Sequence, residues 1–186
     1  MALTYSSYKT LGRGDKAPDF FLPGIDGKNY SPKNFNKAKA LLIVFMCNHC
    51  PFVQPKVSKL VQLHKDYAAK GLAIVGINAN DTTQYPDDSF ENMKLFAKEK
   101  GIGFAYLFDE SQETPKKYGA TCTPDPFLFD SGMRLAYHGR IDDAHKQEPS
   151  KAKTNELEEA IKQVLAGKEV GVQVLPSMGC NIKWKQ

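Results

Sequence analysis

The sequence contains, at residues 41–53, the stretch LLIVFMCNHCPFV. It begins with six consecutive apolar residues, from Leu41 to Met46, which is typical of a strand buried on both faces of a sheet. After Cys50 the apolar residues recur at about the 3.6-residue spacing of an amphipathic helix. They are Val53, Val57, Leu60 and Val61. Cys47 and Cys50 therefore lie where a buried strand passes into a helix.

This position gives the two cysteines a specific chemistry. The N-terminus of a helix carries unpaired N–H groups and a partial positive charge, which stabilise an anion. We expect Cys47 to be the thiolate, because a nucleophilic cysteine needs such a field or a nearby cation to lower its pKa. Cys50 can then attack a mixed disulfide formed at Cys47 and release the partner, while His49 adds positive charge beside the thiolate. The motif predicts a dithiol/disulfide redox centre.

A Cys-x-x-Cys pair can also be half of a metal site. Structural zinc needs a second ligand pair, and the sequence has none, because Cys122 and Cys180 are isolated. A soft metal such as Cu(I), held by Cys47, Cys50 and either His49 or Cys122, would make the protein a metal carrier on the same fold. We keep this as an alternative and predict no resident metal. We also predict no organic cofactor, because no glycine-rich phosphate loop follows any strand.

Composition argues against several classes of partner. The chain has 186 residues and a net charge of +4, and its lysines are spread among acids, so we expect no nucleic-acid partner and no membrane partner. Residues 1–14 lack the apolar segment of a signal peptide, and no stretch approaches the ~20 apolar residues of a membrane span. We therefore expect one cytoplasmic domain, residues 1–186.

The other elements are expected in a regular order. Residues 1–17 have little periodicity and are interpreted as an N-terminal arm, which leads into a hairpin that turns at Asp26–Gly27. Pro55 is expected to kink the first helix, and Asp88 is expected to be the N-cap of the second. Further strands are predicted near 72–78, 104–108, 127–130 and 133–138, further helices near 88–100, 110–118 and 155–166, and a C-terminal extension over 168–186. This order predicts an α/β fold with a central mixed sheet flanked by helices.

The chain resembles the thioredoxin fold, and within it the redoxin branch related to the alkyl hydroperoxide reductase and thiol-specific antioxidant (AhpC/TSA) proteins. The resemblance covers roughly Lys16 to Ala166. It is carried by Ala17-Pro18-Asp19-Phe20 through Asp26-Gly27, by the Cys47–Cys50 motif, by Pro55, and by Tyr118-Gly119-Ala120-Thr121-Cys122-Thr123-Pro124. It implies a cis peptide bond between Thr123 and Pro124 that faces the disulfide, with neighbouring backbone groups pairing with substrate. It also implies an oxidoreductase with antioxidant activity.

The sequence departs from thioredoxin itself in two ways. Thioredoxin has a buried acid six residues before its first cysteine, where this chain has Leu41, so the acid that accepts the proton of the second cysteine is missing from that strand. The presence of His49 between the cysteines resembles the strongly oxidising bacterial dithiol oxidases, which stabilise the thiolate. The resemblance therefore implies a reduction potential above the ~−270 mV of thioredoxin.

The sequence also departs from typical peroxiredoxins, which place a proline and a threonine before the peroxidatic cysteine. Counted back from Cys47, these positions hold Ala40 and Val44; counted back from Cys50, they hold Ile43 and Cys47. Arg140 is the candidate for the cation that a peroxidase needs, although a solvated arginine fits that position equally well. Peroxidase activity is the second choice for these reasons.

Two thiols remain outside the motif. Cys122 comes two residues before Pro124, which places it near the rim of the expected site, either as a third redox thiol or as a small packed residue. Cys180 follows Gly179 in the C-terminal extension, where a turn can aim its thiol in a resolving or relay role.

Taken together, these features predict a thiol–disulfide oxidoreductase. In this hypothesis Cys47 attacks, Cys50 resolves and His49 tunes the thiolate, while Thr123 and Pro124 guide the substrate. The expected partners are protein or small-molecule disulfides, or peroxides, together with a thiol reductant.

Overall fold

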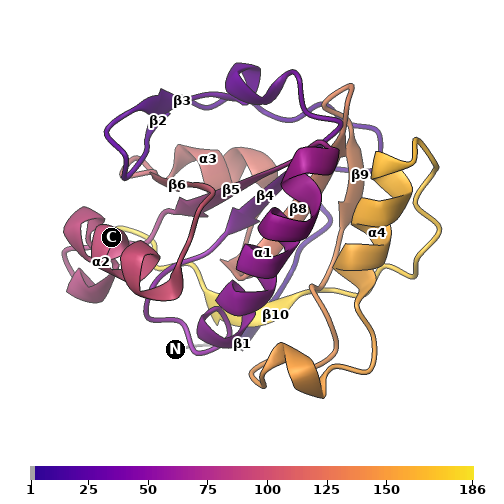
Figure 1. Cartoon of the computed structure of the whole chain (residues 1–186). Coiled ribbons are helices and arrows are strands. Elements are labelled where there is room, and N and C mark those ends of the chain that lie inside the picture. Colours follow the sequence, from indigo (N-terminus) through magenta and orange to yellow (C-terminus); the bar gives the residue numbers. More distant parts are fainter. Residues whose placement is uncertain (1–2) are drawn as a thin grey trace.

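The computed structural model describes residues 3–186, and a five-stranded sheet forms its centre (Figure 1). The strands are β4 (Ala40–Phe45), β5 (Leu72–Asn78), β6 (Ala105–Phe108), β8 (Asp125–Asp130) and β9 (Leu135–His138). Their order across the sheet is β6-β5-β4-β8-β9. β4, β5 and β6 are parallel, β8 runs antiparallel to β4, and β9 runs antiparallel to β8. The predicted central mixed sheet is confirmed.

β4 occupies the middle of this sheet because all of its side chains are apolar and all are buried. Successive side chains of a strand point to opposite faces. Leu42 and Val44 accordingly enter the apolar core on one face, and Leu41, Ile43 and Phe45 enter the core on the other. A strand buried on both faces fixes where its carboxyl end lies, and the Cys-x-x-Cys motif follows directly from that end.

Helices cover both faces of the sheet. They are α1 (Gln54–Tyr67), α2 (Phe90–Lys100), α3 (Glu113–Tyr118) and α4 (Glu156–Leu165), with short 3-10 helices at Pro32–Phe35, Ala68–Lys70, Pro86–Asp88 and Pro149–Lys151. Residues of α1, α2 and α4 share the core on one face (Figure 1). α3 packs on the other face with the hairpin of β2 (Leu22–Pro23) and β3 (Asn29–Tyr30), which confirms the predicted hairpin.

The prediction that Pro55 kinks the first helix is wrong. α1 begins at Gln54, so Pro55 lies in the first turn, where the backbone N–H has no partner within the helix and its loss costs nothing. The chain already turns before the helix, since the carbonyl of Cys50 accepts hydrogen bonds from the N–H groups of Val53 and Gln54.

The two ends of the chain meet in a second, three-stranded sheet. Its strands are β1 (Leu3–Tyr5), β10 (Met178–Asn181) and β7 (Cys122–Thr123), in the order β1-β10-β7. The interpretation of residues 1–17 as an arm without regular structure is therefore corrected for 3–5, and Met1 and Ala2 lie outside the described residues. The C-terminal extension lies against the fold, because Lys183 N–H donates to Asn80 Oδ1 at 2.9 Å.

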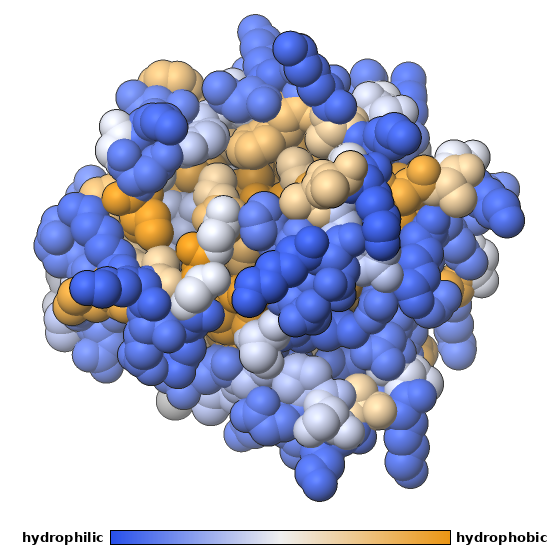
Figure 2. Space-filling view, in the orientation of Figure 1, coloured by the Kyte–Doolittle hydropathy of each residue, from blue (hydrophilic) through white to orange (hydrophobic). Residues whose placement is uncertain are grey.

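The surface in the view of Figure 1 is mostly hydrophilic, with apolar residues gathered in a hollow near the β2–β3 hairpin (Figure 2). A small pocket in that region is lined by Ile25, Ile102 and Phe104. Within residues 3–186, none of the helices has the length and apolar character needed to cross a membrane.

Candidate active site

Cys47 and Cys50 lie in the turn between β4 and α1, beside the loop that precedes β8. Cys47 Sγ is 3.7 Å from Thr123 Oγ1, and Cys50 Sγ is 3.2 Å from the carbonyl oxygen of Thr123. The Thr123–Pro124 peptide bond is cis, as the resemblance implied. Cys47 is 1% exposed and Cys50 is 0% exposed, so both sulfurs are shielded from solvent.

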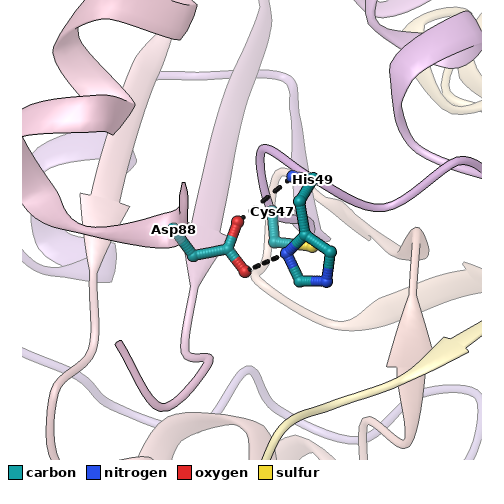
Figure 3. A group of neighbouring side chains, drawn as sticks. All are labelled: Cys47, His49 and Asp88. Atoms are coloured by element: carbon teal, nitrogen blue, oxygen red, sulfur yellow. Dashed lines mark hydrogen bonds and ion pairs between the residues drawn. The ribbon is translucent and has the colours of Figure 1, made fainter. Parts of the chain in front are cut away.

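A buried acid reaches the motif from the loop before α2. The Asp88 carboxylate accepts hydrogen bonds from the backbone N–H groups of Asn48 at 2.8 Å and His49 at 3.2 Å. Its other oxygen lies 2.6 Å from His49 Nδ1 (Figure 3). The same oxygen lies 2.7 Å from Asn80 Nδ2. The prediction that Asp88 is the N-cap of α2 is wrong, since Ser89 holds that position and accepts from the Asn92 N–H. Asp88 instead anchors the Cys-x-x-Cys turn.

His49 and Asp88 form a charged pair. The hydrogen bond to Asp88 raises the pKa of His49 above its ordinary value. Burial alone would raise the pKa of Asp88, but hydrogen bonds from His49 and Asn80 outweigh it and lower that pKa. The pair therefore favours the protonated, positively charged form of the imidazole near Cys47, whose Sγ lies within 4.8 Å of ligand atoms of both partners (Figure 3). A buried acid is therefore present beside the motif, and it contacts Asn48 and His49.

The surroundings of the two thiols differ from the expectation that Cys47 is the thiolate. Burial raises the pKa of Cys47 well above its ordinary value, and hydrogen bonding with Cys50 adds to the effect. The pKa of Cys50 is lowered, chiefly by its hydrogen bond with the Cys47 thiol and further by Thr123 and Cys180. The helix begins at Gln54, nearer to Cys50 than to Cys47, so its positive end does not favour Cys47.

Cys180 is brought to the same place by β10. It lies opposite Thr123 in the β10–β7 register, close enough to Cys50 to lower the pKa of that thiol. Burial raises the pKa of Cys180 to about 12. The preceding Gly179 permits the approach, because a Cβ there would lie 2.0 Å from the Thr123 carbonyl oxygen.

Cys122 has the surroundings of a packed side chain. It is fully buried, and its sulfur lies 3.9 Å from the carbonyl oxygen of Pro124 and 4.0 Å from that of Ser177. Burial raises its pKa far above the ordinary value. A redox role for Cys122 stays a prediction, and these contacts favour the packing role.

A cleft opens beside Cys180. Its volume is about 680 Å³. It is lined by Leu3, by Pro51 and Phe52 in the turn before α1, by the loop of residues 143–147, and by Met178 and Cys180. The loop is tied to α1 by a buried ion pair, in which Lys56 Nζ donates to Asp142 Oδ1 at 2.6 Å and to the Gln147 carbonyl at 3.1 Å. Neither Cys47 nor Cys50 lines this cleft.

Comparison with known proteins identifies the family. The family model for AhpC/TSA matches residues 13–138, which is most of the chain. The chain belongs to the AhpC/TSA family. The fold and family expected from the resemblance are thereby confirmed.

Proteins similar to this chain include two solved structures and a curated protein. The crystal structure of a hypothetical protein from Sinorhizobium meliloti 1021 is 42% identical, with a TM-score of 0.90 and 98% of each chain covered. That of an uncharacterized conserved protein from Geobacillus kaustophilus is 40% identical, with a TM-score of 0.91, and covers 100% of this chain and 97% of that one. The thiol-disulfide oxidoreductase ResA of Bacillus cereus is 26% identical over 160 residues, 86% of this chain and 83% of the relative.

Arg140, the candidate cation for a peroxidase site, is engaged elsewhere in the fold. The Arg140 guanidinium is held by Glu156, with Nε donating to Glu156 Oε1 at 2.9 Å and Nη2 donating to the same oxygen. Arg140 is therefore committed to a structural ion pair, which removes the candidate cation that the sequence offered for a peroxidase site.

One group of residues in this AhpC/TSA chain has ligand atoms close enough to share a metal ion. Within residues 3–186, these atoms belong to Cys47, His49 and Asp88 and lie within 4.8 Å of one another. The expected soft-metal set of Cys47, Cys50 and His49 or Cys122 is not the one that the fold assembles. Asp88 already accepts four hydrogen bonds, which a metal would have to replace, so the geometry fits a charged pair better than a metal centre.

Proposed function

We propose that this AhpC/TSA chain is a thiol–disulfide oxidoreductase whose redox-active pair is Cys47 and Cys50. The observation that carries the proposal is that both sulfurs lie against Thr123 of the cis-proline loop, close enough for each thiol to shift the pKa of the other. Two thiols in contact can form a disulfide with little movement of the backbone. The printed name of the ResA relative, a thiol-disulfide oxidoreductase, supports the same reaction class.

The reaction exchanges two electrons between this pair and a disulfide. A disulfide substrate is reduced to two thiols, and Cys47 and Cys50 lose two protons and two electrons as their disulfide forms. An external thiol reductant reverses the change at the end of each cycle. His49, held by Asp88, supplies positive charge that favours the thiolate form of the pair.

A paired reactivity assay tests this proposal. One sample of reduced protein receives stoichiometric hydrogen peroxide and another receives a disulfide, after which thiols are trapped and mapped by peptide mass. We expect fast disulfide exchange, slow reaction with peroxide, and a Cys47–Cys50 bond. Cys47→Ser and Cys50→Ser should each abolish turnover, and Cys122→Ser serves as the matched control. Fast peroxide reduction would make the protein a peroxidase, and full turnover in both single variants would refute the proposal.

Several finer expectations remain part of the proposal. They are a cytoplasmic location, an antioxidant role and a reduction potential above the ~−270 mV of thioredoxin. A titration of the dithiol against a glutathione buffer measures the potential directly.

A further inference from the structure

We propose that Cys180 is a third catalytic thiol, which meets small anionic disulfides in the cleft and passes the exchange to Cys50 and then to Cys47. This inference rests on the proposed function and deepens it, because it names the substrate class and the path by which that substrate reaches the buried dithiol. The path is carried by three thiols that lie in sequence between the cleft and the end of β4.

The first part of the path is the contact between Cys180 and Cys50. Cys180 lies opposite Thr123, whose carbonyl oxygen is 3.2 Å from Cys50 Sγ. Gly179, the residue before Cys180, brings β10 so close to Thr123 that a Cβ there would lie 2.0 Å from the same carbonyl oxygen. Cys50 is close enough to both Cys180 and Cys47 for each of them to shift its pKa, and we infer that it can form a disulfide with either one.

The second part is access. Cys47 and Cys50 are 1% and 0% exposed, and neither lines the cleft, whereas Cys180 is 5% exposed and does line it. β10 also occupies the edge of β7 at Thr123, so an extended substrate peptide cannot pair there while β10 is in place. A substrate that enters through the cleft consequently meets the sulfur of Cys180 first.

The third part is the chemistry of the cleft. Its volume of about 680 Å³ falls within the range of ~300–1,000 Å³ that is common for small-molecule sites. Phe52 and Met178 form an apolar wall of the cleft. Its other lining residues include the imidazole of His145 and the cationic ammonium group of Lys146. Lys146 Nζ lies 4.6 Å from the centre of the Phe52 ring, and the one acid of the cleft, Asp143, is engaged by the N–H groups of Lys153 and Thr154. The charge of Lys146 acts to lower the pKa of Cys180, which places this cation near the entry thiol, so we expect a small disulfide whose negatively charged substituent pairs with Lys146.

The exchange balances in three steps for a disulfide RSSR′. The Cys180 thiol attacks one sulfur of RSSR′ while its proton passes to the leaving R′S⁻, which forms the mixed disulfide Cys180–S–S–R and releases R′SH. The Cys50 thiolate attacks Cys180 Sγ, which forms a Cys50–Cys180 disulfide and releases RS⁻, and RS⁻ takes the proton of Cys47. The Cys47 thiolate attacks Cys50 Sγ, which forms Cys47–Cys50 and leaves Cys180 as a thiolate. RSSR′ is reduced by two electrons, and the dithiol is oxidised by two.

The first test compares Cys180→Ser with the matched control Cys122→Ser, using oxidised glutathione as the probe. We expect Cys180→Ser to slow turnover by roughly tenfold or more, because the entry thiol is no longer held against the substrate. Cys122→Ser should leave turnover unchanged. If Cys180→Ser turns over oxidised glutathione at the wild-type rate, the relay is refuted, while the proposed function stands. If the wild type itself shows no disulfide exchange, the proposed function has failed.

A second test looks for the intermediate. In Cys47→Ser the exchange cannot reach its last step, so oxidised glutathione should leave a Cys50–Cys180 disulfide, which peptide mass mapping identifies. Detection of this bond would support the relay. A mixed disulfide of glutathione on Cys50 with a free Cys180 would contradict it, because the substrate would then have reached Cys50 directly.

A third test distinguishes a relay from a strand that merely blocks the dithiol. Gly179→Ala pushes β10 away from Thr123, whereas the matched control Gly171→Ala adds a methyl group in open space. The relay predicts slower turnover of oxidised glutathione in Gly179→Ala, because Cys180 moves away from Cys50. Faster turnover would overturn the relay and identify β10 as a cover. Circular dichroism of both variants shows that the main sheet remains folded.

Lys146 tests the substrate class. Lys146→Gln should weaken the reaction with oxidised glutathione, which is anionic, and leave or improve that with cystamine, which is cationic. Lys65→Gln, on the exposed side of α1, is the matched control. Equal effects of Lys146→Gln on both disulfides would contradict an anionic substrate.

Discussion

The two sheets of this molecule are built in different ways. In the main sheet, β4 and β5 are continuous apolar segments that pair over six residues, from Ala40 opposite Leu72 to Phe45 opposite Ile77. In the second sheet, β1, β10 and β7 are short strands taken from the two ends of the chain and a loop. The apolar core packs on both faces of the main sheet, while the second sheet lies over Cys47 and Cys50. We infer that the main sheet determines the stability of the fold and that the second sheet determines the reactivity of the thiols.

The largest effect is expected when a side chain is shortened to alanine in each sheet and the two losses of stability are compared. Leu42→Ala, in the fully buried centre of β4, should lower the free energy of unfolding by about 3 kcal/mol, because it leaves a cavity in the core. Met178→Ala, on half-buried β10, should lower it by less than about 1 kcal/mol. Denaturant unfolding of both variants measures the difference. Equal losses would show that the second sheet is as important to stability as the main one.

A smaller effect is expected where the Cys-x-x-Cys turn is held between the sheets. Asp88→Asn removes the charge that pairs with His49 and replaces one acceptor oxygen with a donor, so it should cost about 2 kcal/mol. It should also lower the pKa of His49, which NMR titration of the ring measures. Asp87→Asn, at an exposed neighbouring position, is the control. An unchanged His49 pKa in Asp88→Asn would show that Asp88 does not control the charge at the site.

Amide hydrogen exchange sharpens the comparison without a mutation. The amides of β4 and β5 should exchange only through global unfolding, because both strands are central in a buried sheet. The amides of Gly179 and Cys180 should exchange faster, through local opening of the short β1-β10-β7 sheet. Mass spectrometry of exchanged peptides measures both rates. Identical protection of β10 and β4 would mean that the two sheets open as one unit.

The smallest expected effect is the pH dependence of stability. The raised pKa of His49 means that its contribution is complete below its unfolded value of about 6.5 and is lost as pH rises through the raised pKa. The lowered pKa of Asp88 means that its contribution is complete above about 3.9 and is lost as pH falls through the lowered pKa. The pair should therefore stabilise the protein most between these limits.

A comparison of wild type with His49→Gln isolates this effect, because the other titrating groups are common to both. The difference in unfolding free energy should be largest near pH 5 to 6 and should shrink as the pH rises beyond about 6.5. A difference that is constant from pH 5 to 9 would contradict a charged His49.

The same division explains what could be predicted from the sequence. β5 was expected over 72–78 and found there, because a buried strand has a signature in its own residues. The expected cis bond before Pro124 also proved correct, because the resemblance rests on a local motif. Both features depend on residues that are neighbours in the chain.

The incorrect predictions involve either contacts between distant segments of the chain or the position at which the first helix begins. Asp88 has a residue pattern suited to an N-cap, and nothing near it in the sequence says that its carboxylate bonds to residues 48 and 49. The loop that follows β5 was the available signal, since the carboxyl ends of parallel β4 and β5 lie at one edge of the sheet. The pairing of β10 with β7 has no local signature beyond Gly179 before Cys180. Pro55 was misjudged because the helix begins later than its apolar spacing suggests.

The most direct test of the account is a map of the disulfide in the fully oxidised wild-type protein. The protein is oxidised with excess oxidised glutathione, its remaining thiols are alkylated, and the peptides are identified by tandem mass spectrometry. The account predicts a Cys47–Cys50 disulfide, with Cys122 and Cys180 alkylated as thiols. Alkylated Cys47 and Cys50 in a protein that has nevertheless consumed its oxidant would contradict it, because the redox centre would then lie elsewhere.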